Sequence, residues 1–370
     1  MTAILRTYKY RLYPNKKQQR YFTKCFGGTR FIYNQMLHNK KEIYEKYKDD
    51  PETLKNIKPR IYTSYKHEHE WLKEVDNYAL ANAQIDLMTA YNRFYRGISK
   101  FPKFKSKKNR RNSYKTNNQG DNIRIENNKV NLPKIKFVRL KYHRPIKGKI
   151  RSCVISMVSS GKYYISILTE EIPDKHNKTD AIVGVDLGIK DFVVMTNNLG
   201  SSIKIKSPRF LIESEKELVK QSRALSRKKT GGSNFHKARI KLSKIHEKIA
   251  NQRKDFLHKL SCKITNENQV IVIESLKLSD IQKNRMLSKA VSDASWYEFA
   301  RQLEYKSKWK ERRLVKADQW YPSSQTCSNC GNIEGKKPLN IRHWKCSDCG
   351  AIHDRDINAS INLLKIGMAV

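Results

Sequence analysis

Four of the seven cysteines form two CxxC pairs near the carboxyl end of the chain, separated by fifteen residues. They are Cys327, Cys330, Cys346 and Cys349. This spacing is typical of a tetrahedral zinc site made of four cysteines, and four thiolates leave no open coordination position for water, so we expect a structural zinc ion. A redox dithiol is a weaker alternative because it needs only one pair. The scattered cysteines, which are expected in the core, are Cys25, Cys153 and Cys262.

Two carboxylates lie within or at the end of apolar runs. Asp186 is part of IVGVDLGI, and Glu274 ends VIVIE. A buried carboxylate costs free energy unless hydrogen bonds or a cation compensate it. Either residue alone could be a structural acid, but together, on two predicted central strands, they indicate a metal site. Two Mg²⁺ ions held about 3.5–4 Å apart by carboxylates can hydrolyse a phosphodiester, because one activates the attacking water and the other stabilises the leaving 3′ oxygen.

A third carboxylate is offered by the stretch HDRDINASINLL, which contains Asp354 and Asp356. If a helix begins at Arg355, Asp354 is its N-cap and its side chain is taken up by backbone N–H groups. The predicted buried stripe of that helix is Ile357, Ile361 and Leu364. Asp356 flanks this stripe, which favours it as the metal ligand. Alternatively, both aspartates are helix-start acids near the positive end of the helix dipole.

The elements that must position these acids follow one order. Residues 181–206 read as three strands in succession, and a long basic helix follows over 235–260. The strand that ends in Glu274 comes next, then a helix for which Ser295 and Glu298 fit a capping box, and finally the strand RLVKADQW. Three meandering strands, then helix, strand, helix and strand, are the order of an RNase H-type α/β domain.

The first half of the chain reads differently. Residues 1–13 alternate as a strand, and Asn15 with Gln18 fits a capping box that starts a helical region extending to about Arg96. Short β-branched runs follow over 122–169 and predict a small antiparallel barrel, which the first strand can join. An apolar stripe expected to pack one of the helices comprises Ile85, Met88, Tyr91, Phe94 and Tyr95.

The charge of the chain points to a polyanionic partner. Lys plus Arg number 76 and Asp plus Glu 35, which gives a formal net charge of +41. Nucleic acid or an anionic membrane surface could neutralise it. No apolar window reaches about 18 residues, so no membrane span is expected, and the amino terminus lacks the apolar core of a signal peptide. An intracellular nucleic-acid partner is therefore favoured.

One segment concentrates that charge, because no acidic residue occurs between Asp86 and Asp121. Cations there alternate with aromatic rings, which can neutralise phosphates and stack on unpaired bases. A solvated basic loop is the alternative interpretation. The cations expected to contact nucleic acid are Lys103, Lys105, Lys107, Lys108, Arg110 and Arg111.

Taken together, these stretches resemble the TnpB family of transposon-encoded nucleases, which is related to type V CRISPR effectors. The resemblance rests on GVDLGIKDF, VIVIESL, WYPSSQTCSNCG, CSDCG and HDRDINASINLL, and in the first half on YKYRLYPNKKQ, RFIYN and FPKFKSK. It extends over nearly the whole chain.

The resemblance implies an α/β RNase H-like (RuvC) nuclease domain with an inserted four-cysteine zinc ribbon, preceded by a small β-barrel (wedge) domain that carries a helical recognition insertion. The implied ranges are 1–14 and 116–175 for the wedge domain, 15–115 for the recognition domain, 181–320 and 351–370 for the nuclease domain, and 321–350 for the ribbon.

The implied activity is RNA-guided, Mg²⁺-dependent cleavage of double-stranded DNA beside a short transposon-adjacent motif, with a guide RNA from the transposon end. The implied catalytic acids are Asp186, Glu274 and Asp356, the last as the second aspartate of a D-x-D pair, and Asn82 lies near the motif-reading region. A monomer in a prokaryotic cytoplasm, on the nucleoid when bound to DNA, is favoured. The alternatives are an RNA-guided binder or repressor without cleavage and a conventional transposase.

Overall fold

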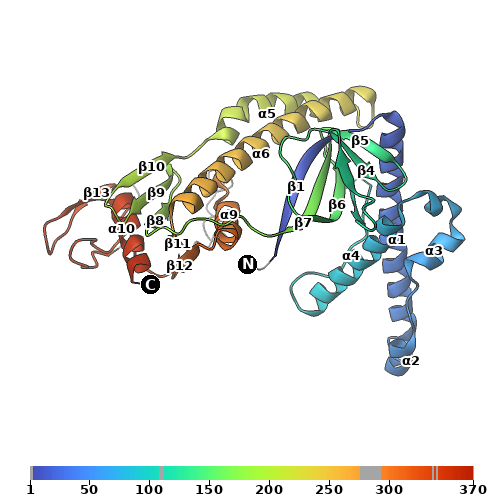
Figure 1. Ribbon diagram of the computed structural model, residues 1–370, viewed down its shortest axis with the longest axis horizontal. Helices are drawn as coiled ribbons and strands as arrows, with labels where there is room; N and C mark the ends of the chain where they lie inside the picture. Colours follow the sequence, from blue (N-terminus) through green and yellow to red (C-terminus); the bar gives the residue numbers. More distant parts are fainter. Residues whose placement is uncertain (1–2, 108–111, 276–292, 336, 339–340, 370) are drawn as a thin grey trace. The chain divides into compact units, whose positions relative to one another are not determined.

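The chain divides into two compact units, Met1–Ile172 and Pro173–Val370 (Figure 1). The structure is a computed structural model and describes residues 3–107, 112–275, 293–335, 337–338 and 341–369. Among these residues, no helix is both long and apolar enough to cross a membrane.

The first unit contains an antiparallel sheet of seven strands in the order β2-β6-β7-β1-β5-β4-β3. The strands are β1 Ile4–Tyr13, β2 Asn112–Asn117, β3 Arg124–Glu126, β4 Lys129–Leu132, β5 Lys136–Leu140, β6 Lys149–Met157 and β7 Tyr163–Glu171. The first strand joins this sheet between β7 and β5, as predicted. In the described part of the chain no ladder joins β2 to β3, so the sheet is open where the sequence predicted a closed barrel.

The edge strand β2 is covered by helices instead of by another strand. The helical elements between β1 and β2 are α1 Lys16–Tyr47, α2 Pro51–Asn56, α3 Tyr62–Glu68, the 3-10 helix η1 Glu70–Glu74 and α4 Asn77–Tyr95. Both α1 and α4 pack against β2. The amide of Asn82 on α4 donates to the backbone carbonyl of Lys115 on β2 at 3.3 Å. This side chain therefore satisfies a carbonyl that an edge strand leaves without a strand partner.

The amino end of α1 has the predicted capping box. The Asn15 side chain accepts from the Gln18 backbone N–H at 2.9 Å, and the Gln18 side chain accepts from the Asn15 N–H at 3.0 Å. Two otherwise unsatisfied donors are thereby paired at the point where the chain leaves β1.

The apolar stripe predicted for α4 is wrong for three of its members. Ile85, Met88 and Tyr95 are 55%, 49% and 75% exposed. The helix packs instead through another face, which carries Ala79, Leu80, Asn82, Ala83, Leu87 and Tyr91. This face combines alanines, which let α4 approach its neighbours closely, with the buried side chains of Leu80, Leu87 and Tyr91.

The second unit contains a five-stranded sheet in the order β10-β9-β8-β11-β12. The strands are β8 Ile182–Leu187, β9 Asp191–Asn197, β10 Ser202–Lys206, β11 Val270–Glu274 and β12 Arg313–Ala317. The first three form an antiparallel meander, and β11 lies parallel to both β8 and β12. The helices α5 Phe210–Ser226 and α6 Ser233–Glu267 precede β11, and α9 Trp296–Trp309 precedes β12. The element order predicted for this half is confirmed except that α5, which was not predicted, lies between β10 and α6.

The capping box predicted for α9 is wrong. Ser295 has a left-handed backbone (φ 56°) and makes no side-chain cap bond, while Glu298 accepts hydrogen bonds from Arg301 and Gln302. A capping box needs an extended N-cap residue, and the left-handed turn at Ser295 does not provide one.

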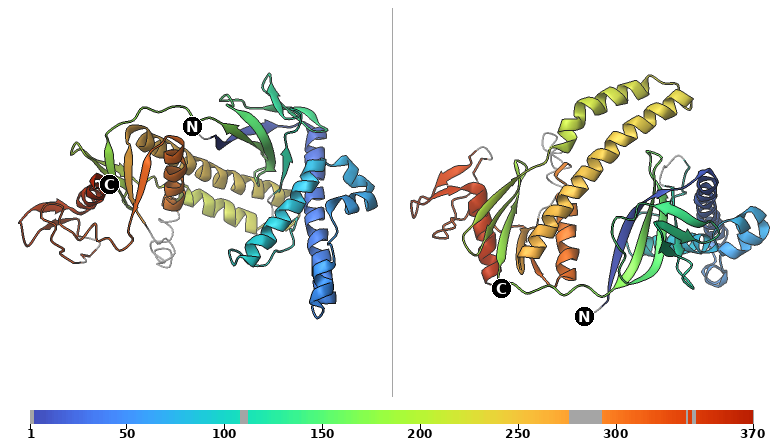
Figure 2. Two further views of the ribbon diagram at one scale, coloured as in Figure 1. Left: turned by 60° about the horizontal axis from the view of Figure 1, so that its bottom comes forward. Right: turned by 45° about the horizontal axis from the view of Figure 1, so that its top comes forward.

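Different helices cover the two faces of the second sheet (Figure 2). Val183, Val185 and Ile273 point to the face covered by α6 and α9. The other face is covered by the last helix, α10 Arg355–Met368, and Val272 meets Leu363 there. Because side chains alternate along a strand, Asp186 and Glu274 lie on the α10 face.

The position of α10 depends on Gly184. A Cβ at this residue would lie inside van der Waals contact with the carbonyl oxygen of Ser360 and the backbone nitrogen of Leu364. Only glycine therefore allows the helix backbone to rest directly on β8.

We expect Gly184→Ala to lower the free energy of unfolding by about 1–3 kcal/mol, because α10 must move away from the sheet. Gly27→Ala is the matched control: Gly27 lies within α1 with no atom within 4 Å of its Cβ position. There alanine should be neutral or stabilising by up to about 1 kcal/mol. Urea titration followed by circular dichroism measures both variants, and an equal effect would contradict this account of the α10 contact.

Candidate functional site

Three carboxylates from separate elements converge at the edge of the second sheet where the strands β8 and β11 end. The parallel register pairs Ile273 with Val185, so the next residues, Glu274 and Asp186, lie side by side on β11 and β8. Asp356 is the second residue of α10, which covers the same face. Two strand ends and one helix start therefore bring together the acids predicted from the sequence.

The electrostatics confirm that these acids interact. Burial raises the pKa of Asp186 well above its usual range, the neighbouring Glu274 raises it further by its charge and a hydrogen bond, and Asp356 adds to the effect. Arg355 opposes the shift. Like charges brought together at a partly buried position cannot all ionise without a counter-charge. This arrangement is the one that a divalent cation stabilises.

Arg342 supplies part of that counter-charge at Asp356. Its Nη1 donates to Oδ1 at 3.1 Å and to Oδ2 at 3.0 Å. Among the described residues, only the four clustered cysteines bring their ligand atoms all within 4.8 Å of one another, so the carboxylates are more widely spaced than the cysteines.

Asp354 caps α10, as predicted. Its Oδ1 accepts from the backbone N–H groups of Asp356 and Ile357 at 3.1 and 3.0 Å, and its Oδ2 accepts from Lys204 Nζ at 2.6 Å. Burial opposes ionisation of Asp354, but Lys204 and the two N–H groups hold its pKa below its usual range. Asp354 is thus fully engaged in starting the helix.

The buried stripe predicted for α10 is largely wrong, because Ile357 and Ile361 are only half-buried. The buried side chains are Asn358, Ala359, Ser360, Asn362, Leu363 and Leu364. Small residues face the sheet because α10 lies so close to it, and Ser360 bonds Thr196 on β9 at 2.6 Å. Asp356 lies one turn before Ala359 and Ser360 and thus on the face toward the sheet.

Two asparagines that sequence reasoning missed connect α10 to the segment before the first cysteine pair. Asn358 and Asn362 both donate to the carbonyl of Thr326, at 2.8 and 2.7 Å, and both also donate to the carbonyl of Ser323. The hydroxyl of Ser323 donates to Glu274 at 2.9 Å. The available signal was the spacing of four residues in NASIN, which places both amides on one helix face.

Space for a substrate exists beside Glu274. It lines one cleft of about 320 Å³ together with Trp296 and Lys316. It also lines a smaller cleft of about 170 Å³ formed by the segment that includes Ser323. Of the three acids, Glu274 is the one that lines these two clefts.

The four predicted cysteines form a second cluster. Their Sγ atoms all lie within 4.8 Å of one another. The Sγ atoms of Cys327 and Cys349 are 3.6 Å apart, and those of Cys330 and Cys346 are 3.7 Å apart. Ligands at about 2.3 Å from a central ion are about 3.8 Å apart in a tetrahedron, whereas a disulfide is about 2.05 Å long. The four thiols therefore fit a tetrahedral cation.

The thiols of this cluster differ in their surroundings. The Asn329 amide and the Ala351 N–H lower the pKa of Cys349 to about 6. At Cys330 the Asn332 backbone lowers the pKa, but burial and the neighbouring thiols raise it to about 12. Trp344 is only 6% exposed because its ring packs against His353, 4.7 Å away, beside Cys327 and Cys346. Trp344 and His353 lie on the strands β13 His343–Lys345 and β14 Ile352–Asp354.

Of the scattered cysteines, Cys25 and Cys153 are buried as predicted, but Cys262 on α6 is exposed. It lies on the solvent side of a turn whose neighbour, Ser261, is buried. A prediction based on apolar neighbours in sequence does not resolve the two sides of a helix.

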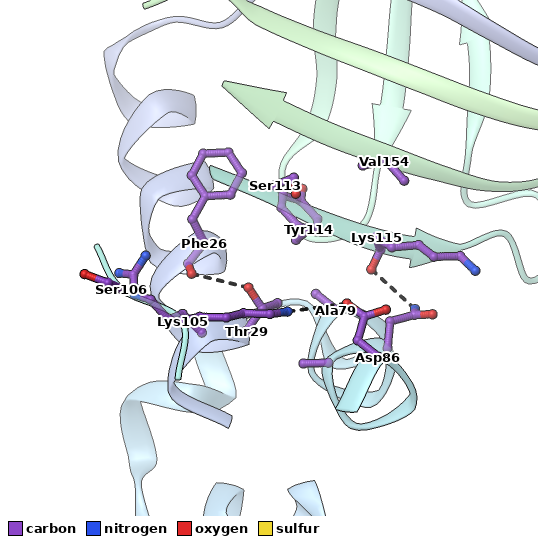
Figure 3. Close-up of a pocket in the computed structure, with 13 residues that line it drawn as sticks. Phe26, Thr29, Ala79, Asp86, Lys105, Ser106, Ser113, Tyr114, Lys115 and Val154 are labelled. Carbon is purple, nitrogen blue, oxygen red and sulfur yellow. Dashed lines mark hydrogen bonds and ion pairs between the residues drawn. The ribbon is translucent and has the colours of Figure 1, made fainter. Parts of the chain in front are cut away.

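Two of the nucleic-acid residues predicted in the first unit, Asn82 and Lys105, line a cavity of about 450 Å³ between α1, α4 and β2 (Figure 3). Lys105 forms an ion pair with Asp86 at 3.7 Å and lies 4.0 Å from the Tyr33 ring centre. Asn82 lines the cavity but is only 4% exposed, and its amide nitrogen also donates to the Tyr78 carbonyl oxygen at 2.7 Å.

Lys103 and Lys107 are exposed on the loop after α4, whereas Lys108, Arg110 and Arg111 lie outside the described residues. The side-chain amide of Asn34, which sequence reasoning missed, fixes this loop. It donates to the backbone carbonyl of Lys105 at 2.9 Å and accepts from the backbone N–H of Lys105 at 2.8 Å. Contacts of these residues with nucleic acid stay predictions.

Comparison with protein families gives three matches along the chain. Residues 164–285 match the family described as "Probable transposase", residues 296–363 match the family described as "Cas12f1-like, TNB domain", and residues 1–49 match a family described as "Helix-turn-helix domain". The first two matches include all three carboxylates and all four clustered cysteines.

Two relatives align with almost the whole chain, and a third aligns with part of it. A protein of Streptomyces pristinaespiralis, provisionally named an RNA-guided DNA endonuclease, is 36% identical over 100% of this chain and 91% of its own length. InsQ of Escherichia coli K12, with the same provisional name, is 28% identical over 99% and 93%. A TnpB-like mimivirus protein is 27% identical over 63% of this chain and 46% of its own.

A chain in a cryo-EM structure of the Cas12f1–sgRNA–target DNA complex has the same fold, with a TM-score of 0.59, 15% identity and 98% coverage of both chains. The sequence relationship to the Streptomyces protein spans the complete chain, the cysteine cluster and the carboxylate edge. This chain belongs to the TnpB family.

Proposed function

We propose that this protein is an RNA-guided, Mg²⁺-dependent DNA endonuclease that cleaves DNA matched to its guide RNA beside a short transposon-adjacent motif. The observation that carries the proposal is the convergence of Asp186, Glu274 and Asp356 at one sheet edge, with the pKa of Asp186 raised by burial and by its acidic neighbours. The provisional names of the two relatives that span almost the whole chain support the RNA-guided activity.

In this proposal the three carboxylates are the ligands of the catalytic cations. Two bound Mg²⁺ ions would activate a water and stabilise the leaving 3′ oxygen. Burial and the neighbouring acids raise the pKa of Asp186, and a bound cation would compensate this effect so that Asp186 would ligate it as a carboxylate. Arg342 holds Asp356 at the start of α10 and would share or release that carboxylate to a cation. Ser323 orients Glu274.

We propose a RuvC-like nuclease domain for the second unit, because an antiparallel meander followed by two parallel strands places the acids at the sheet edge. The proposed ranges are 181–320 and 351–370, interrupted by a ribbon over 321–350 that binds structural zinc. In the first unit we propose a wedge domain over 1–14 and 116–175 around a recognition domain over 15–115. The strand β2, Asn112–Asn117, spans the boundary between these two proposed ranges.

The proposed partners are a guide RNA from the transposon end and a double-stranded DNA target. A net charge of +41 matches a complex in which the protein holds an RNA–DNA heteroduplex largely by contacts to the sugar–phosphate backbone of that heteroduplex. Asn82 and the cations from Lys103 to Arg111 are the proposed contacts in the first unit. An RNA-guided binder without cleavage would not need three carboxylates in one site, so the nuclease is favoured.

We expect Asp356→Ala to lower the rate of plasmid cleavage at least about 100-fold, because bound metal stabilises the transition state by several kcal/mol. Asp186→Ala should do the same. The assay uses protein purified with its native flanking RNA, Mg²⁺ and a plasmid with a guide match beside a randomised flank. RNA binding, measured by gel shift, should remain intact.

Asp354→Ala is the matched control two residues away. It should mainly lower the free energy of unfolding, by about 1 kcal/mol for the lost N-cap, and leave cleavage measurable at low temperature. Equal loss of cleavage from both aspartate variants would contradict the assigned roles. Tight binding of target DNA by the wild-type protein without any cleavage would instead support the non-cleaving alternative.

Zinc binding by the cysteine cluster should stabilise the second unit. Cys330 is exposed, so Cys330→Ser removes a ligand without creating a cavity, and we expect the Tm to fall by at least about 5 °C with loss of one zinc per chain. Cys262 is an exposed cysteine outside the cluster, so Cys262→Ser is the control and should leave both the Tm and the zinc content unchanged. An unchanged Tm and zinc content in Cys330→Ser would refute the structural role.

A further inference from the structure

The first unit has a second, larger hollow away from the Asn82 cavity. It has a volume of about 740 Å³ and lies between the last third of α1, α2 and the end of α4. This hollow is called the aromatic groove below. The lysines and aromatic residues in its lining include Lys40, Lys41, Tyr44, Tyr91, Tyr95 and Phe101. We propose that the aromatic groove binds an unpaired nucleobase of a single-stranded segment of nucleic acid, with its phosphates held by the two lysines.

The rings of the groove are held in place by one another. Tyr91 and Tyr95 are stacked with centres 6.0 Å apart, and Phe101 packs edge-on against Tyr91 at 5.6 Å. Tyr91 is buried, but Tyr95 is 75% exposed and Tyr44 is 56% exposed. Rigid rings with one free face are what an unpaired base requires for stacking.

The cations of the groove lie directly over these rings. Lys40 Nζ is 4.6 Å from the Tyr91 ring centre, and Lys41 Nζ is 5.4 Å from that of Phe101. Within the described residues neither lysine has a carboxylate within ion-pair distance. Glu45, the acid on the groove wall, has Lys48 at 3.4 Å. Two cations beside an apolar floor match a phosphate next to a base.

Charge also decides which occupant fits. The wall formed by the end of α4 and the loop after it belongs to the stretch from Asp86 to Asp121, which contains no acidic residue between those two positions. A second copy of this chain would bring another net charge of +41 to a positively charged surface. A neutral apolar ligand would leave both lysines without a counter-charge. Nucleic acid satisfies the rings and the cations together.

The exposed side of α4 extends the same surface. Met88 on α4 and Ile98 in the loop after it are 49% and 61% exposed, and Met88 belongs to the part of the predicted stripe that does not pack within the unit. The volume of the groove falls within the range of about 300–1,000 Å³ that is usual for small-molecule sites, which is ample for one nucleotide. The inference rests on the proposed nucleic-acid partners but does not require cleavage.

The experiment uses full-length protein, without divalent metal, and photocrosslinking to two oligonucleotides of one sequence. One is single-stranded RNA with 5-iodouridine and the other is single-stranded DNA with 5-iododeoxyuridine. We expect a crosslink in the peptide that contains Tyr95 or in the one that contains Tyr44, located by mass spectrometry. The arm that gives it identifies RNA or DNA as the source of the base. Crosslinks confined to other peptides in both arms would overturn the proposal.

Substitutions separate stacking from simple burial. Tyr95→Leu keeps an apolar side chain but removes the ring, and should weaken binding of the crosslinked oligonucleotide about tenfold, as measured by fluorescence anisotropy. Tyr95→Phe keeps the ring and should bind as the wild type. Lys41→Met should reduce the slope of log Kd against log salt by about 0.7, which corresponds to one phosphate contact on a single strand.

Because Tyr95 is exposed, we expect an unchanged Tm in Tyr95→Leu and Tyr95→Phe, which would show that any loss of oligonucleotide affinity is local. Wild-type affinity in Tyr95→Leu would refute the base site. If Asp186-dependent cleavage persists in that case, the groove proposal fails while the proposed nuclease function stands. If neither oligonucleotide binds the wild-type protein at all, both fail.

Discussion

The candidate site depends on how closely α10 approaches β8. Gly184 has no side chain, so the backbone at Ser360 and Leu364 rests directly on the strand, and Asp356 is brought to the edge where Asp186 and Glu274 end their strands. The same helix holds the segment before the first cysteine pair through Asn358 and Asn362. One helix therefore positions a carboxylate and anchors the approach to the cysteine cluster.

Three neighbouring carboxylates repel one another, and the positive side chains of the protein compensate only part of this repulsion. Arg342 neutralises Asp356, and Lys204 neutralises the cap residue Asp354, while burial and the neighbouring acids leave the pKa of Asp186 raised. A carboxyl group whose pKa is higher in the folded than in the unfolded protein lowers the free energy of unfolding as the pH rises between those two pKa values. A divalent cation would remove this cost, so cation binding and stability are coupled at this edge.

Much of this site could be predicted from the sequence, because a charge inside an apolar run and a CxxC pair are local signals. The N-cap of α10 and the capping box at Asn15 are local in the same sense. The packing faces of α4 and α10 were not predicted correctly, since alanines and hydrogen-bonded asparagines form part of them beside leucines and apolar periodicity does not count such residues. The Arg342 contact also depends on tertiary placement. The domain ranges and the nucleic-acid contacts stay predictions.

The central claim is that Asp186, Glu274 and Asp356 form one cation site. The most direct test is Mn²⁺ binding to protein free of nucleic acid, followed by electron paramagnetic resonance between about pH 6 and about pH 8, in wild type and Asp186→Asn. The account predicts that wild-type affinity rises with pH, because Asp186 must lose its proton before it binds the ion. Asp186→Asn should bind at least about tenfold more weakly and with less dependence on pH. Equal affinity and equal pH dependence in both proteins would contradict a shared site.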